Sequence, residues 1–127
     1  MHTHGLVYDA STSDPVDASA LEAQLDEVFA LTQEAVLAGR PIVYVVHEPS
    51  IWGHDTPLRA ALTTALMGAM RSAAVEGVRA GLAANVVAVD EDVDPVQRDA
   101  AVDFALTSGL TGQLLTCGTT HLGRPAA

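Results

Sequence analysis

The sequence contains no lysine, and its six basic residues are all arginines: Arg40, Arg59, Arg71, Arg79, Arg98 and Arg124. The chain acting alone therefore cannot use a mechanism that needs an amine, such as a Schiff base or a lysine phosphate clamp. Sixteen acidic residues give a formal net charge of −10 at pH 7. A surface with this charge repels phosphate backbones and anionic lipids, which argues against nucleic-acid and membrane partners.

Cysteine and long apolar runs are also scarce. The single cysteine, Cys117, cannot form an internal disulfide and lies in an apolar run, which predicts a buried, unreactive thiol. No segment approaches the roughly 20 consecutive apolar residues of a membrane span, and the first residues lack a signal-peptide pattern. We therefore expect a cytoplasmic protein. The chain has 127 residues, 49% of them hydrophobic, which suits one domain with its own core.

Short apolar runs alternate along the chain with longer segments whose apolar residues have helical spacing. Short runs predict four strands, at Leu6–Tyr8, Ile42–Val46, Val86–Val89 and Gln113–Cys117. Helical spacing of apolar residues predicts a helix from Ser19 to Gly39, a second from an Asp55 cap to about Arg79, and a shorter one near Val96 to Leu106. Strands that alternate with helices in this way indicate an α/β fold with a parallel sheet.

This arrangement leaves apolar surface without an obvious cover. Right-handed connections place the first two helices on one face of the sheet, so the other face has only the short third helix. The continuous valines of the inner strands nevertheless predict burial on both faces. The second helix is also apolar nearly all round. We therefore expect an oligomer.

Four segments, in order and at matching spacing, resemble the C-terminal half of short-chain dehydrogenases/reductases. Gly39–Val46 is similar to the family's fifth strand, Ala61–Ser72 to the helix that carries its catalytic Tyr and Lys, Gly81–Ala88 to the next strand, and Leu110–Leu115 to the start of the last strand. The match covers the chain from about Leu6 to Gly123. It implies that residues 1–127 are a half domain without the N-terminal dinucleotide-binding strands. The implied fold is a partial Rossmann-like three-layer fold with about four parallel strands, two long helices and one short helix.

At the matching positions, the residues that perform the family's chemistry are replaced. The relay Asn falls near Gln24, the catalytic Ser at His47, and, with a one-residue gap, the Tyr at Arg59 and the Lys at Thr63. The family's phosphate loop needs a Gly-x-Gly, which the sequence lacks. The resemblance therefore implies no catalytic residue, no cofactor-binding residue and no metal ligand in this chain. NAD(P) is then expected only in a partner subunit.

The resemblance also implies an assembly surface, because the family pairs its two long helices across a two-fold axis as a four-helix bundle. Small residues along the second helix would permit close approach. The expected interface comprises Val28, Leu58, Leu62, Ala65, Met67, Ala69, Met70, Ala73 and Leu114. We therefore expect a non-catalytic subunit that assembles with itself, or with a full-length active dehydrogenase/reductase, and supports it structurally.

Two alternatives remain open at the remnant cleft. The first is a homodimer that binds a small molecule near His47, Trp52 and Arg59, where the arginine holds a carboxylate or phosphate. The second is an enzyme with a new mechanism at His47, Glu48 and Arg59.

Other polar clusters have simpler interpretations. His47, Glu48, His54 and Asp55 share one loop, but their spacing fits no standard metal site. The acidic loop from Asp90 to Pro95 lacks the glycine and terminal glutamate of a calcium loop. Ser50, His54 and Asp55 are too close in sequence for the usual hydrolase triad, and no nucleophile elbow surrounds Ser50.

Overall fold

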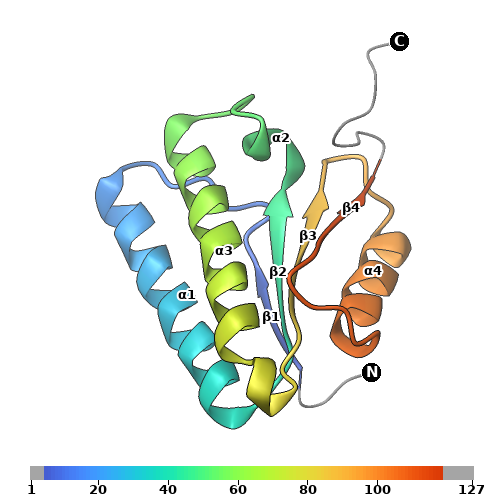
Figure 1. Ribbon diagram of the computed structural model, residues 1–127. Helices are drawn as coiled ribbons and strands as arrows, with labels where there is room; N and C mark the ends of the chain where they lie inside the picture. The colour runs from blue at the N-terminus through green and yellow to red at the C-terminus, as the bar shows by residue number, and fades with distance from the viewer. Residues whose placement is uncertain (1–4, 119–127) are drawn as a thin grey trace.

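A computed structural model describes residues 5–118, which form a parallel sheet between two layers of helices (Figure 1). The four strands lie in chain order: β1 (Leu6–Asp9), β2 (Ile42–His47), β3 (Ala84–Val89) and β4 (Leu114–Cys117). The helices are α1 (Ala18–Ala38), the short α2 (Glu48–Ile51), α3 (Pro57–Glu76), the 3-10 turn η1 (Val78–Ala80) and α4 (Pro95–Thr107). The predicted three-layer α/β fold with four parallel strands is confirmed. None of these helices is both long and apolar enough to cross a membrane.

The larger core lies on the face of the sheet covered by α1 and α3, which run side by side (Figure 1). Alternate residues of β2, among them Ile42, Tyr44 and Val46, point to this face as the pleat of a strand requires. Leu66 of α3 packs against them and is fully buried. The Tyr44 hydroxyl lies 2.6 Å from Thr32 Oγ1 of α1, so the buried phenol keeps a hydrogen bond.

Within residues 5–118, the opposite face of the two central strands is covered by α4, with Val93 of the preceding loop beside it. The four valines that face it are Val43, Val45, Val87 and Val89, and each is at most 3% exposed. The expectation that this face needs a cover from outside the chain was therefore wrong for β2 and β3. Among the described residues it still applies to the edge strand β1, where Val7 remains 45% exposed.

The connection from β3 through α4 to β4 has an unusual hand. The chain advances across the sheet in one direction, from β1 to β4. Helices α1 and α3 cover one face, whereas α4 covers the other (Figure 1). The β3–α4–β4 crossover therefore has the hand opposite to the other two, which are right-handed. Left-handed crossovers of parallel strands are rare, so specific contacts must hold this one in place.

The side chain of Asn85 supplies those contacts from the middle of the sheet. Asn85 is fully buried on β3. Its Nδ2 donates to the carbonyls of Ala105 (3.2 Å) and Leu110 (2.8 Å), and its Oδ1 accepts from the backbone N–H of Gln113 (3.0 Å). One amide thus binds the last turn of α4, the loop after it and the residue before β4. These contacts fix the return of the chain to the sheet.

Three local predictions need correction. The segment after β2 forms the short helix α2 rather than a loop. Thr56, not Asp55, caps α3, because its Oγ1 accepts from the Arg59 backbone N–H at 3.2 Å. Helix α3 ends at Glu76, before the predicted Arg79, and the chain continues as the 3-10 turn η1; Gly77 lies at this junction, where a Cβ would lie 2.6 Å from a Leu82 methyl carbon.

Replacing Asn85 by leucine is expected to lower the free energy of unfolding by about 3 kcal/mol, because two carbonyls and one N–H lose their buried partner. Denaturant unfolding followed by circular dichroism measures this change. Gln113→Ala is the control: only the backbone N–H of Gln113 binds Asn85, so this variant should stay within about 0.5 kcal/mol of the parent. An Asn85→Leu protein as stable as the parent would contradict the role given to this amide.

Candidate functional site

A cavity of about 420 Å³ lies at the carboxyl ends of the strands, where parallel α/β sheets place their binding sites. It is bounded by the loop after β1, the end of β2, the first turn of α3, the loop after β3, and α4. The lining residues are Ser11, Thr12, His47, Arg59, Val89, Asp90, Glu91, Val93, Pro95 and Arg98. The two residues predicted to replace the family's Ser and Tyr, His47 and Arg59, thus lie in one cavity.

His47 connects two loops through both ring nitrogens. The end of β2 buries its side chain to 5% exposure. Its Nδ1 lies 3.0 Å from Ser50 Oγ and 3.3 Å from Asp55 Oδ2. Its Nε2 lies 2.5 Å from Oε1 of Glu91, which belongs to the loop after β3. The imidazole therefore joins the ends of β2 and β3 on the floor of the cavity.

Arg59 is held in the same way by two partners. Its Nη1 donates to Asp55 Oδ2 at 2.9 Å, and its Nη2 donates to the Ser11 carbonyl at 2.7 Å. Because its side chain is only 14% exposed, these contacts fix the guanidinium between α3 and the loop after β1. Its Nε is buried and has no hydrogen-bond partner among the described residues.

The two carboxylates beside these bases remain ionised to unusually low pH. The pKa of Glu91 is lowered first by its hydrogen bond with His47, and also by the charges of His47 and Arg59. The pKa of Asp55 is lowered first by the Thr56 backbone N–H, and then by Arg59 and His47. Local hydrogen bonds and the neighbouring His47 and Arg59 therefore stabilise the ionised form of both carboxylates.

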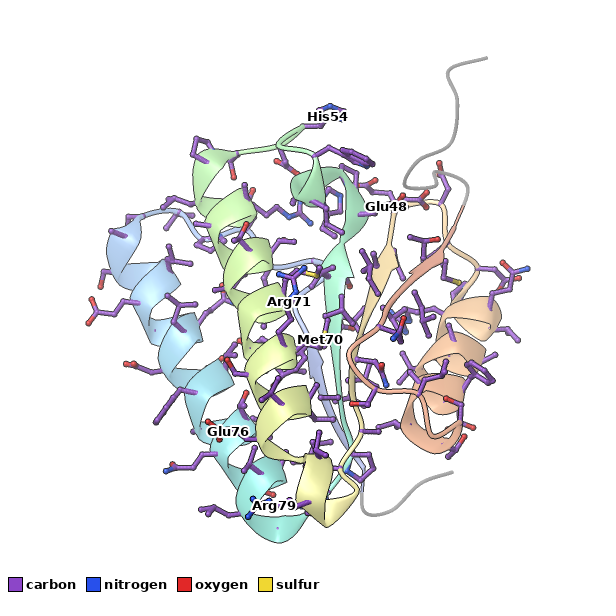
Figure 2. All side chains as sticks on the ribbon, in the orientation of Figure 1. Glu48, His54, Met70, Arg71, Glu76 and Arg79 are labelled. Atoms are coloured by element: carbon purple, nitrogen blue, oxygen red, sulfur yellow. The ribbon has the colours of Figure 1, made fainter. Side chains whose placement is uncertain are left out.

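A hydrolase triad is not available here, although the structure brings part of one together. Ser50 and Asp55 both contact His47, which is not the histidine of the set considered from the sequence. Ser50 is only 2% exposed, however, and a substrate cannot reach its hydroxyl. His54, the histidine considered from the sequence, is exposed at the tip of the loop (Figure 2).

The other predicted site residues lie outside the cavity lining. Thr63 is buried on α3 one turn beyond Arg59. Gln24 of α1 donates to Ser13 Oγ at 3.0 Å. Trp52, half exposed, and Glu48, fully buried, complete this set. The predicted trio of His47, Trp52 and Arg59 therefore reduces to His47 and Arg59.

Sequence reasoning missed three residues of the cavity: Ser11, Glu91 and Arg98. Glu91 was assigned to a solvated acidic loop, and it is 71% exposed as that assignment implies. Its contact with His47 spans 44 positions of the chain, so no local sequence pattern signals it. Arg98 lies on α4 and reaches Asp9 at the end of β1 at 3.7 Å, which is also a contact distant in sequence.

No metal centre is formed within residues 5–118, where no three His, Cys, Asp or Glu side chains are placed to share an ion. Cys117, predicted to be buried, is only partly so. The pKa of its thiol is raised, first by burial and then by the charges of Asp90 and Asp94. The thiol is therefore protonated at neutral pH, which agrees with the predicted low reactivity.

A second surface feature is an apolar groove between α1 and α3, with a volume of about 550 Å³. Of the predicted interface residues, Val28, Ala65 and Ala69 line it, and Val28 is only 4% exposed. Leu62, Met70 and Ala73 are buried within the chain, Met67 and Leu114 pack against the core, and Leu58 lies at a separate hollow. The large apolar side chains exposed around the groove are Phe29 and Leu37, which the sequence prediction did not include.

Comparison with known proteins establishes the fold. The sequence matches no protein-family model, and it matches no curated protein. Its structure matches a short-chain dehydrogenase, the citronellol catabolism dehydrogenase AtuB of Pseudomonas aeruginosa PAO1, with a TM-score of 0.68 and 22% sequence identity. The match covers 89% of this chain and 59% of the dehydrogenase. The predicted Rossmann-like fold is confirmed, and the described chain spans little more than half the length of that relative.

Replacing Glu91 by glutamine should flatten the acid limb of the stability profile. Because its pKa is lowered in the folded state, the Glu91 carboxylate stabilises the fold above its unfolded pKa of about 4.3, and this contribution disappears as pH falls through the folded value. Unfolding free energies measured between about pH 5 and pH 3 test this. Glu34→Gln, which removes the same charge from the exposed pair with Arg40, should keep the parent slope. Equal slopes for all three proteins would show that the His47 contact contributes nothing.

Proposed function

We propose that this chain is a non-catalytic short-chain-dehydrogenase-like subunit that assembles through the outer face of α1 and α3. Its partner is a second copy or a full-length active dehydrogenase/reductase, which the chain supports structurally. The observation that carries the proposal is the apolar groove of about 550 Å³ along these two helices. Within residues 5–118 nothing covers this surface, although the central strands β2 and β3 behind it are already buried on both faces by the chain itself.

The exposed side chains of this face favour contact with protein. Phe29 is 68% exposed and Leu37 is 79% exposed, and both line the groove. On α3, Val75 is 74% exposed, while Ala65 and Ala69 leave room for a helix to approach. Full burial of a side chain of this size contributes roughly 1.5–3 kcal/mol, so burial of Phe29, Leu37 and Val75 in an interface would contribute several kcal/mol to its stability.

The area of this face is sufficient for a stable interface. Helices of 21 and 20 residues are each about 30 Å long, and two packed helices are about 20 Å wide. The face therefore presents about 600 Å², and pairing it with a similar face buries about 1,200 Å² in total, the lower limit for a specific interface.

The polar cavity supports the non-catalytic part of the proposal. Hydride transfer by a short-chain dehydrogenase needs a tyrosine that exchanges a proton near neutral pH. The cavity lining contains no tyrosine. Tyr44 is buried on β2 with a raised pKa, and the pKa of Tyr8 is also raised, in both cases mainly by burial. His47 and Arg59, at the replaced positions, are held by partners within the chain. In this proposal NAD(P), where it is used, belongs to the partner.

The charge of α1 distinguishes the two kinds of partner. The helix carries four acidic residues and no basic one: Glu22, Asp26, Glu27 and Glu34. Self-association brings two such helices together, so their repulsion should weaken the homodimer at low salt and salt should strengthen it. A partner with basic residues around the matching face should show the opposite dependence.

The first test is the mass of the purified protein by light scattering after size exclusion, at low and high salt. A mass of about 26 kDa, twice the 13.1 kDa of the chain, means self-assembly. A monomer that forms a complex when a dehydrogenase encoded beside it is added means a supporting role for that enzyme. A monomer that binds neither would overturn the proposal.

Phe29→Glu is expected to abolish the assembly while leaving the fold intact, because the side chain is exposed within one chain and a charge buried in an interface costs several kcal/mol. The matched control is Phe104→Glu on α4, a 55% exposed phenylalanine on the opposite side of the sheet. Light scattering gives the mass and circular dichroism checks the fold. If both variants assemble like the parent, the α1–α3 face is not the interface.

A further inference from the structure

We propose that the cavity at the carboxyl end of the sheet binds a small monocarboxylate with a short apolar body, and that Glu91 occupies the carboxylate position until such a ligand displaces it. This inference does not depend on the assembly proposed above. The cavity lies at the strand ends and α4, whereas the groove lies along the outer face of α1 and α3, and the two share no lining residue.

The first supporting observation is the convergence of basic groups. The chain has only six arginines and no lysine, yet two of the arginines line this one cavity, together with His47. The three side chains come from separate elements, His47 from β2, Arg59 from α3 and Arg98 from α4. Guanidinium groups hold carboxylates through paired N–H donors. Both Nη atoms of Arg59 already donate to Asp55 and Ser11, so Arg59 contributes its charge to the cavity. Arg98, whose side chain is 35% exposed, is the more accessible of the two guanidinium groups.

The second observation is Glu91 itself, which shows where a carboxylate is stabilised. Its Oε1 lies 2.5 Å from His47 Nε2, and the charges of His47 and Arg59 both lower its pKa. The side chain is nevertheless 71% exposed and belongs to a loop, so its release into solvent requires little desolvation or repacking. Ion pairs that involve an exposed side chain contribute little to stability, so a ligand that makes additional contacts in the cavity can displace Glu91.

The remaining lining defines the rest of the ligand. Val89, Val93 and Pro95 supply an apolar wall beside the basic groups. A cavity of about 420 Å³ lies within the usual range for small-molecule sites, about 300–1,000 Å³. Asp90 also lines the cavity and repels negative charge on a ligand, so this repulsion is smaller for a ligand with one negative charge than for a ligand with two. A short aliphatic acid therefore fits the cavity better than a phosphate dianion.

Hexanoate is the probe, titrated at neutral pH while amide chemical shifts of the full chain are recorded. We expect saturable shifts at the cavity residues and none along the α1–α3 groove. Glu91→Gln should bind hexanoate about fivefold more tightly, because the internal competitor loses its charge. Glu34→Gln is the matched control, since it removes the same charge from the ion pair with Arg40. Its affinity should equal that of the parent.

A second pair of variants tests the recognition of the carboxylate. Arg98→Ala should weaken hexanoate binding about fivefold, whereas Arg71→Ala, which removes an exposed arginine of α3 (Figure 2), should not change it. Hexylamine and inorganic phosphate, tested in the same way, should not displace hexanoate. The proposal is overturned if hexanoate fails to bind Glu91→Gln, if Glu34→Gln tightens binding as much as Glu91→Gln does, or if hexylamine or phosphate competes equally well.

Discussion

The burial of β2 and β3 on both faces is the constraint on which the rest of this structure depends. All six residues of each strand are buried, so every side chain has to find a helix on one side or the other. Helices α1 and α3 cover one face, and α4 has to cross to the other, which gives the third crossover its unusual hand. Asn85 stabilises that crossing, because its buried amide makes three hydrogen bonds to the backbone. Loss of the amide would leave these backbone groups without partners, at a cost of several kcal/mol in the free energy of unfolding. The polar groups are then gathered at the strand ends, where His47 is the last residue of β2.

The order of the elements could be predicted from the sequence because it depends on local patterns. Uninterrupted β-branched residues such as Val43 and Val45 signal strands buried on both faces, and α1 and α3 follow from helical spacing. The sequence left the second face of the sheet to the short third helix, and α4 lies there. What holds α4 in place could not be predicted, because it depends on contacts between Asn85 and residues 20 to 28 positions later. The end of α3 was placed about one turn late, at about Arg79, because the helix passes at Gly77 into the 3-10 turn Val78–Ala80, which continues the same apolar segment.

The candidate site was predictable only in its position. The carboxyl edge of a parallel sheet and the resemblance to short-chain dehydrogenases both pointed to His47 and Arg59, and the structure places them in one cavity. The partners of these residues could not be predicted. Asp55 and Ser11 hold Arg59, and Glu91 reaches His47 from the next loop. Composition was misleading here, since a run of acidic residues normally indicates a solvated loop, and one member of this run makes a specific contact with a buried base.

The same contacts explain how the fold accommodates charged and polar side chains at the carboxyl edge of the sheet. A buried cation without a partner is costly, so the largely buried Arg59 requires a carboxylate beside it. Asp55 supplies that carboxylate for Arg59, four residues earlier on the same segment, and Glu91 contacts the buried imidazole of His47. The two pairs differ in the exposure of the carboxylate. Asp55 is 21% exposed and contacts both His47 and Arg59, whereas Glu91 is 71% exposed and contacts His47 through Oε1. The Arg59 pair therefore belongs to the framework of the fold, while the His47 pair can open without disturbing the sheet beneath it.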